Sequence, residues 1–576
     1  MRHFATLSAL VAGAYAAYTP TRTVARRDSS PFVSTQNGQF VVNGSNFRFI
    51  GTNAYWLPFL PNEDDINTVL ADMAASNITV VRTWGFNDVT EIPTDGSPWL
   101  QLLAPNGTTV INNGTDGLQR LDRLVDLAAQ NGIHVLFSLT NNWNPVVGDT
   151  LNPGGQPSRR NEPAPSATRP RNFLSNDYGG MDAYVRALGP SKLHSEFFTD
   201  MTIRAAFQNY TQAVVERFSA NPWVLAWELA NDPRCNSSMS TADDCNTNTV
   251  TQWHEDVGSF VKTVDPNHLV SSGSSGFTCP TCHKLFSTTP KPAPSSTASK
   301  KKRAPVLTEA EQARRVIAAR KRSEAVPADG VKIRGRWVAN KNARRQSSSG
   351  SVGSAFDGST GVDSSDILNA PSIGFGSLQY FPDQNSYSTL GQSSQASSDA
   401  GSLGQEKIGP DQLNFTAILQ QGVDFIQMQA SLAQASGKPL ALTGFGLVTQ
   451  ENGPFFVPFN ATVPLLNQTS SALSRRQSSS NAGTLGVTQD QQNTAYNTWL
   501  QAGIQAGLGG LTQYQWSAGN LTATNGGLVQ ANATNTDGTL SQGDSPNDGY
   551  GGLGQQSNVQ GELGQAVFNL TSFGNA

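Results

Sequence analysis

The chain alternates between short apolar runs and longer segments in which apolar residues recur every three or four positions. Residues 64–76 have this helical spacing and are followed by an apolar run that ends at Trp84. A second helical segment, 118–131, is closed by Gly132 and followed by "HVLFSLT". The same pattern predicts further helices over 199–220 and 249–264, and further strands over "WVLAWELA", "HLVSSG" and "LTQYQW".

The predicted strands are almost wholly apolar, which indicates a parallel sheet that is buried on both faces. Roughly eight helix–strand units fit along the chain, and this number favours a closed (β/α)₈ TIM barrel over an open doubly wound sheet. No Gly-rich phosphate-binding loop follows any of the strands, so the nucleotide-binding alternative loses support.

Three stretches break this rhythm within a predicted barrel that spans residues 32–573. They cover 144–176, 283–350 and 473–481, and they are rich in Pro, Ser, Arg and Asn. Only 37% of all residues are hydrophobic, so we expect these stretches to be disordered insertions beside a folded core.

The second insertion is strongly basic, although the whole chain has a formal net charge of −4. Between Lys284 and Arg345 there are seventeen Lys and Arg residues against four Asp and Glu residues. Basic runs can bind nucleic acid or anionic surfaces. In a secreted chain a solvated insertion is the favoured interpretation, so we expect no nucleic-acid partner.

The N-terminus is typical of a secreted protein. Arg2 and His3 precede an apolar stretch, and residues 1–16 are expected to form a signal peptide, followed by a possible pro-segment over 17–31. No other apolar run approaches the ~20 residues that would span a bilayer. Twelve Asn-x-Ser/Thr sequons support an extracellular glycoprotein.

The four cysteines form two local pairs in the sequence. Cys235 and Cys245 lie in a loop-like stretch, and Cys279 and Cys282 belong to a Cys-Pro-Thr-Cys-His sequence that formally matches a haem attachment site. With no evident partner ligand, disulfides are the favoured interpretation, and three pairings remain open. We expect neither a cofactor nor a metal.

The ends of the predicted strands carry aromatic, amide and charged side chains. Sugars bind through aromatic stacking on their C–H faces and through hydrogen bonds from amide and charged groups to their hydroxyls. A cleft at these strand ends would therefore suit a carbohydrate. The residues concerned are Asn53, Trp56, Arg82, Trp84, Asn141, Asn142, Trp143, Asn231, Asp232 and Trp516.

At these positions the chain resembles the fungal endo-β-1,4-mannanases of glycoside hydrolase family 5. The motifs "VVRTWGF", "DYGGMDAYV", "WELANDPRC", "DPNHLVSSG" and "FGSLQYFPD" occur in the family's order. The resemblance implies a (β/α)₈ barrel, a retaining glycosidase mechanism and β-mannan or a related cell-wall polysaccharide as the ligand. The substrate-binding residues that it implies are Trp56, Arg82, Asn142, Asn231, Gln379 and Trp516.

The chain departs from the family at both catalytic positions. The acid/base glutamate of the family's Asn-Glu-Pro motif is replaced by Asp232, and the nucleophile of its Leu-Glu-Glu-Phe-Gly motif is replaced by Gly444. Aspartate is one methylene shorter than glutamate, and glycine offers neither a nucleophile nor a charge. The resemblance therefore implies a protein with impaired catalysis, and we expect it to be a monomer.

Two alternatives stay open at this point. The first is an active mannan endo-1,4-β-mannosidase with a relocated nucleophile, for which Glu451 is a candidate in the loop after Gly444. Glu228 is a weaker candidate, since we expect it to be buried and paired with Arg82. The second alternative is a wall-associated structural glycoprotein that uses the barrel only as a scaffold.

Overall fold

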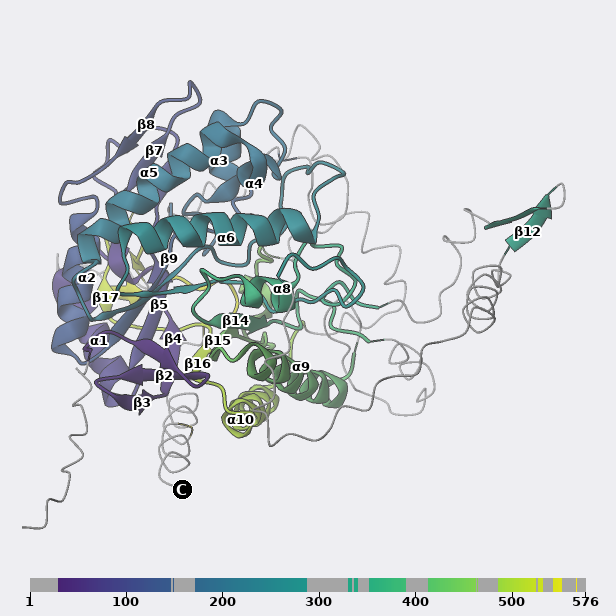
Figure 1. Ribbon diagram of the computed structural model, residues 1–576. Coiled ribbons are helices and arrows are strands. Elements are labelled where there is room, and N and C mark those ends of the chain that lie inside the picture. Colours follow the sequence, from purple (N-terminus) through teal and green to yellow (C-terminus); the bar gives the residue numbers. More distant parts are fainter. Residues whose placement is uncertain are drawn as a thin grey trace, which may run out of the picture.

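Eight parallel strands form the centre of the molecule (Figure 1). The computed structural model describes residues 30–146, 149, 171–286, 330–333, 336–339, 352–389, 413–462, 464, 485–524, 527–531, 542–551 and 566. The predicted signal peptide, nearly all of the pro-segment, the third insertion and most of the first two lie outside these residues. The strands, in chain order, are β4 (Phe49–Asn53), β5 (Val80–Trp84), β9 (His134–Ser138), β10 (Val224–Glu228), β11 (Leu269–Ser271), β14 (Gly376–Tyr380), β15 (Leu440–Phe445) and β16 (Gly510–Gln513).

Each strand pairs in parallel with its neighbour in the chain, and β16 returns to pair with β4. A parallel bridge between Ser271 and Phe375 joins β11 to the start of β14 and closes the ring. The prediction of a (β/α)₈ barrel is confirmed.

Helices surround the sheet, as Figure 1 shows. Among the described residues they are α1 (Glu63–Ala75), α2 (Gln119–Gln130), α3 (Met181–Leu188), α4 (Glu196–Thr199), α5 (Met201–Phe218), α6 (Thr247–Val264), α8 (Ser364–Asn369), α9 (Phe415–Ser436) and α10 (Gln489–Gln505), with short 3₁₀ turns η1 (Leu57–Phe59) and η5 (Gly453–Phe455). None of the described helices has the length and apolar character needed to cross a membrane.

The helix ends follow from local sequence. At α6, the Asn246 side chain accepts from the backbone of Asn248 and Thr249, and the Thr249 hydroxyl accepts in return from the Asn246 backbone, which is a capping box. Helix α9 ends at Gly437, whose φ of +70° suits a residue without a Cβ.

A small N-terminal sheet covers the amino ends of the barrel strands. It consists of β1 (Ser34–Gln36), β2 (Gln39–Val42) and β3 (Ser45–Phe47). Phe40 from β2 is fully buried and packs edge-on against Phe375, 5.0 Å between ring centroids. Phe49 joins the same cluster, and a Cβ on Gly510 would lie 2.0 Å from its ring, so only glycine fits there. This end of the barrel is therefore plugged by apolar side chains.

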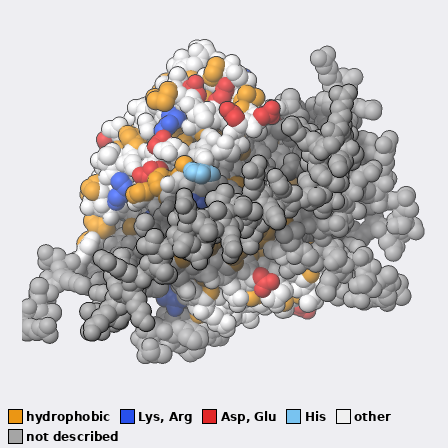
Figure 2. Space-filling view, turned by 45° about the vertical axis from the view of Figure 1, so that its right-hand side comes forward, with side chains coloured by type: hydrophobic (Ala, Val, Ile, Leu, Met, Phe, Trp, Pro, Cys, Tyr) orange, Lys and Arg blue, Asp and Glu red, His pale blue; other side chains and the backbone are white. Residues whose placement is uncertain are grey.

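The other described strands form three small sheets outside the barrel: β6 (Asp88–Val89) with β7 (Gln101–Leu103) and β8 (Thr109–Ile111), β12 (Gly330–Ile333) with β13 (Arg336–Ala339), and β17 (Leu521–Thr522) with β18 (Gln530–Ala531) and β19 (Gln542–Asp544). On the face seen in Figure 2, acidic and basic side chains of the described residues lie interspersed among neutral and apolar ones.

Candidate functional site

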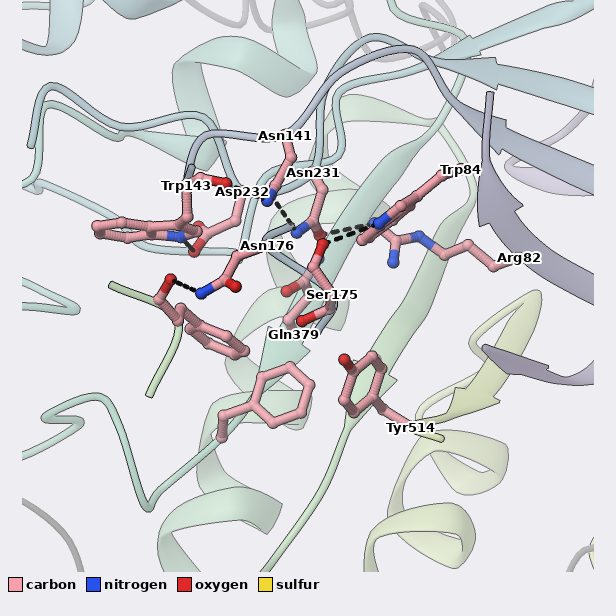
Figure 3. A pocket seen from close by; sticks show the side chains of 13 residues that line it. Arg82, Trp84, Asn141, Trp143, Ser175, Asn176, Asn231, Asp232, Gln379 and Tyr514 are labelled. Atoms are coloured by element: carbon pink, nitrogen blue, oxygen red, sulfur yellow. Dashed lines mark hydrogen bonds between the residues drawn. The ribbon is translucent and has the colours of Figure 1, made fainter. Parts of the chain in front are cut away.

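A cleft lies at the carboxyl ends of the barrel strands, where barrel enzymes place their active sites. Strands β5, β14 and β15 and the loops after β9, β10, β14, β15 and β16 contribute to its walls (Figure 3). Its lining consists of Arg82, Trp84, Asn141, Trp143, Ser175, Asn176, Asn231, Asp232, Gln379, Phe381, Gly444, Phe459 and Tyr514.

Of the eight residues to which the family resemblance gave a catalytic or substrate-binding position, five meet in this lining. They are Arg82, Asn231, Asp232, Gln379 and Gly444, which come from four different strands or the loops after them. The aromatic and amide character expected of a carbohydrate cleft is present beside them.

Three other candidates lie outside the lining. Trp56 is fully buried in the core. Asn142 lies behind the cleft, where its side chain donates to the Asn236 carbonyl, 3.0 Å, and accepts from the Arg234 backbone, 2.8 Å. Trp516 is also buried, and Tyr514 faces the cleft in its place. Strand β16 ends at Gln513. The alternation of side chains between the two faces of a strand therefore does not predict which of the following residues points into the cleft.

Arg82 organises the floor of the cleft. Its guanidinium forms a buried ion pair with Glu228, as the sequence predicted, and Nε lies 3.1 Å from Oε2. Another guanidinium nitrogen donates to Asn231 Oδ1, 2.8 Å, and Gln379 Nε2 donates to the same oxygen, 2.9 Å. Asn231 Nδ2 in turn donates to Asn141 Oδ1, 2.9 Å. The amides are thereby fixed in orientation by a buried charge.

Asp232 is held by Arg234, two residues further along the chain. Arg234 Nε lies 2.9 Å from Oδ1 and a terminal nitrogen lies 2.7 Å from Oδ2, so both carboxylate oxygens are engaged. The Asp232 backbone has a φ of +53°, and its N–H donates to the Gly273 carbonyl, 2.9 Å. Trp143 Nε1 also approaches Oδ2, at 3.4 Å.

Arg234 is itself confined on several sides. Its guanidinium donates to Asn385 Oδ1, 3.1 Å, and lies over the ring of Phe277 at 4.5 Å and that of Trp143 at 5.5 Å. Since the arginine has little room to move, the Asp232 carboxylate is fixed with it.

Gly444 lies within β15, between the ends of β14 and β16. A Cβ built on it would lie 3.3 Å from Cζ of Phe381, which is tighter than an ordinary contact. Asp232 is the one carboxylate in the cleft lining among the described residues. Glu451 has an exposed side chain in the loop after β15 and is not part of that lining.

A buried carboxylate, Asp548, supports the opposite wall. The hydroxyls of Ser175 and Tyr514 both donate to its Oδ2, each at 2.7 Å. Burial raises the pKa of Tyr514 well above its ordinary value, and the nearby charge of Asp548 raises it further. Ser175 and Asn176 belong to the range predicted as the first insertion, so the end of that range is part of the cleft. Their Ser/Asn composition gave no indication of burial.

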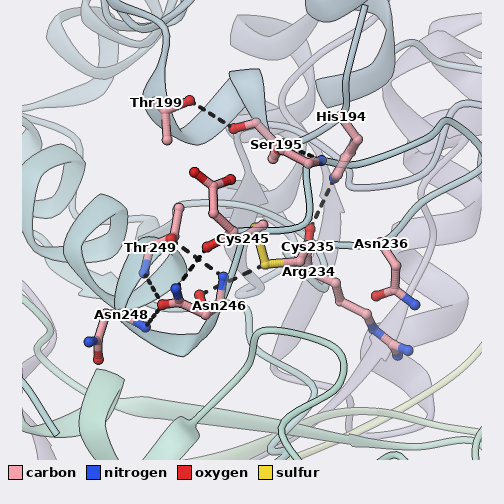
Figure 4. Close-up of a disulfide and its surroundings, with 12 residues drawn as sticks. His194, Ser195, Thr199, Arg234, Cys235, Asn236, Cys245, Asn246, Asn248 and Thr249 are labelled. Carbon is pink, nitrogen blue, oxygen red and sulfur yellow. Dashed lines mark hydrogen bonds between the residues drawn. A yellow bond between two sulfur atoms is a disulfide. The ribbon is translucent and has the colours of Figure 1, made fainter. Parts of the chain in front are cut away.

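Both cysteine pairs form local disulfides, Cys235–Cys245 and Cys279–Cys282. The first joins the loop that carries Asp232 and Arg234 to the start of α6 (Figure 4). Within the described part of the chain, no group of three or more His, Cys, Asp or Glu residues could hold a metal ion.

Comparisons with known proteins show a likeness in sequence over part of the chain and a likeness in fold over most of it. The family described as "GH family 5 beta-mannosidase-like" matches residues 30–293. Mannan endo-1,4-beta-mannosidase A of Aspergillus aculeatus is 39% identical over 43% of this chain and 55% of its own, and mannan endo-1,4-beta-mannosidase F of Aspergillus fumigatus is 38% identical over 43% and 48%. The chain thus spans about half the length of the curated relatives that it matches.

Solved structures extend the likeness along the chain. An endo-1,4-beta-mannanase from Rhizomucor miehei aligns with 93% of this chain and 99% of its own, with a TM-score of 0.53 and 20% identity. An endo-beta-1,4-mannanase from Thermotoga petrophila covers 92% and 78%, with a TM-score of 0.53 and 19% identity. At such identities the likeness establishes the fold alone. Residues 30–293, which include Asp232 but not Gly444, therefore match glycoside hydrolase family 5, and over that part the chain is related to the fungal mannan endo-1,4-β-mannosidases.

Proposed function

We propose that the protein is a secreted, mannanase-like protein that binds β-1,4-mannan or a related cell-wall polysaccharide and hydrolyses it poorly. The observation that carries this proposal is the ion pair that Asp232 forms with Arg234 in the cleft. This aspartate is the one carboxylate lining the cleft among the described residues, and Arg234 engages both of its oxygens. Retaining hydrolysis needs two carboxyl groups ~5–5.5 Å apart, one of which must deliver a proton.

The rest of the cleft supports binding. Five aromatic side chains line it, and they alternate with amides whose orientation is fixed by the Arg82 network. Aromatic faces and oriented amides are what a neutral sugar requires. The two charged groups in the lining, Arg82 and Asp232, are each neutralised by a buried partner, so the cleft favours an uncharged polysaccharide.

Secretion belongs to the same proposal. The predicted signal peptide and sequons support it, and so do the two disulfides, because disulfides persist in oxidising compartments.

The test compares binding with turnover. Purified protein is incubated with insoluble β-1,4-mannan to measure retention, and with soluble mannan to measure reducing ends. We expect retention without appreciable release of sugar. Rapid hydrolysis that persists in Asp232→Ala and in Glu451→Ala would refute the proposal.

A matched pair of phenylalanines in one loop locates the binding site. Phe459 lines the cleft, whereas Phe455 is 54% exposed and is not part of the lining. Phe459→Ala should weaken mannan retention about tenfold, and Phe455→Ala should leave it unchanged. No retention by the unmodified protein would favour the structural-glycoprotein alternative.

A further inference from the structure

Asp548 lies directly behind two residues of the cleft wall. Its side chain is buried, and its Oδ2 accepts from Ser175 Oγ and from Tyr514 Oη, both at 2.7 Å. A carboxylate can only accept, and each hydroxyl has a single proton to give. The hydroxyls of Ser175 and Tyr514 therefore both donate to Asp548, and toward the cleft they can act only as hydrogen-bond acceptors.

Asn176 adds a third acceptor on this wall. Its Nδ2 donates to the carbonyls of Phe459, 2.7 Å, and Ala461, 3.0 Å, which fixes the orientation of the amide (Figure 3). Its Oδ1 is buried and has no hydrogen-bond partner within the described part of the chain. Asn176 is only 4% exposed and lines the cleft, so this oxygen is an unsatisfied acceptor at the site.

The amide donors across the cleft are partly committed within the protein. Gln379 Nε2 donates to Asn231, Asn231 Nδ2 donates to Asn141, and Asn141 Nδ2 donates to the Trp143 carbonyl, 2.6 Å. Each of these amide nitrogens carries a second N–H, so donors remain on that wall, whereas the wall of Ser175, Tyr514 and Asn176 presents acceptors. A ligand must therefore supply hydrogen-bond donors of its own toward the acceptor wall.

We propose that Ser175 Oγ, Tyr514 Oη and Asn176 Oδ1 form an acceptor patch that selects glycan chains whose hydroxyls are free to donate. This inference rests on the proposed function and names the form of the polysaccharide that the cleft takes. Asp548 is the positioning residue of the patch, because it sets the direction of both hydroxyl protons.

The selection acts against O-acylated chains. An ester in place of a hydroxyl removes the donor and presents another acceptor, so buried acceptors of the protein are left unpaired. Sites built to hydrogen-bond a hydroxyl reject analogues that lack it more strongly than apolar sites reject a missing methylene. We expect the unsubstituted polymer to bind at least about tenfold more tightly than its O-acetylated form.

The experiment uses one batch of soluble β-1,4-mannan, half of it chemically O-acetylated, and measures the affinity of the full chain for both forms by affinity electrophoresis. Tyr514→Phe and Ser175→Ala each remove one acceptor and should reduce the preference for the unsubstituted form. Tyr184→Phe is the matched control, since its hydroxyl donates to Gln101 away from the cleft, and it should leave the preference unchanged.

Asp548→Asn separates positioning from general damage. The amide nitrogen can donate to one of the two hydroxyls, so that its proton turns toward the cleft. The ratio of the two affinities should then fall toward one, with a smaller change in affinity for the acetylated form.

The outcomes are distinct. Equal affinity of the unmodified protein for both polymers would overturn the acceptor patch and leave the proposed function standing. A preference that stays unchanged in Tyr514→Phe and Ser175→Ala would overturn its assignment to these residues. Binding of neither polymer would overturn both proposals.

Discussion

The ion pair between Asp232 and Arg234 makes a quantitative prediction about stability. Asp232→Asn keeps the size of the side chain but removes the charge that neutralises Arg234. The two side chains are 3% and 6% exposed, so water cannot take over the role of the lost carboxylate. Breaking a buried pair by removing one partner costs about 3–5 kcal/mol, because the remaining charge is left uncompensated.

Details of the site place the expected loss near the lower end of that range. An asparagine oxygen can still accept one of the two Arg234 hydrogen bonds, and Asn385 continues to accept another. We therefore expect the free energy of unfolding to fall by about 3 kcal/mol. The measurement is urea unfolding followed by tryptophan fluorescence, with the midpoint and slope compared between the variant and the unmodified protein.

A surface ion pair of the same chemistry provides the control. Asp122 and Arg217 pair with side chains that are 33% and 28% exposed, and such pairs contribute about 0.2–1 kcal/mol. Asp122→Asn should thus have a small effect. Adding Arg234→Met to Asp232→Asn should recover part of the lost stability, since it removes the stranded charge. If Asp232→Asn were as mild as Asp122→Asn, the view that Asp232 serves as a fixed counter-ion would be wrong.

Three further predictions follow from single contacts. Burial raises the pKa of Asp88 from 3.8 to about 8, so the folded state holds a proton that the unfolded state releases, and stability should fall as the pH rises from about 4 to about 8. Asp88→Asn should make the free energy of unfolding, measured by thermal unfolding, nearly independent of pH across this window, which removes a change of up to roughly 5 kcal/mol. A variant whose stability depends on pH as steeply as that of the unmodified protein would contradict the assignment. Gly510→Ala should cost about 1–3 kcal/mol in urea unfolding because its Cβ would overlap an aromatic ring of the first barrel strand. Asp232→Glu with Gly444→Glu should release more reducing sugar from mannan when Phe381→Ala is added, since the ring crowds the new side chain; equal release with and without Phe381→Ala would show that the ring is no obstacle.

The barrel could be predicted because its determinants are local and repeated. The apolar run that becomes β5 is buried along its whole length, and the helical spacing that becomes α2 buries one face of that helix. The pairing of Arg82 with Glu228 was also predictable, since a charge within an apolar strand needs a partner.

The cleft was harder to predict because it depends on loops. Whether Tyr514 or Trp516 faces the ligand is decided beyond the end of β16, where no periodicity applies. The capture of Asp232 by Arg234 depends on a left-handed backbone at Asp232, which the residue type alone does not reveal. Ser175 lies in a stretch whose composition is typical of a solvated loop. Its hydroxyl nevertheless donates to Asp548, which is far along the chain, and this hydrogen bond holds it in the cleft wall.

The bridge between Ser271 and Phe375 marks the place where the pairing of neighbouring barrel strands is shortest. Every other neighbouring pair of strands is joined by a ladder of at least two registered residues, whereas β11 and β14 share this one bridge. Separate backbone hydrogen bonds, from Gly374 N to the Val270 carbonyl, 2.8 Å, and from Gln379 N to the Ser275 carbonyl, 3.1 Å, hold the two segments together on either side of the bridge. The chain also makes a long excursion between these two strands, through the basic insertion. The longest addition to the sequence thus lies at the pair of strands with the shortest ladder, where the ring has the least regular pairing to lose if the two strands shift apart.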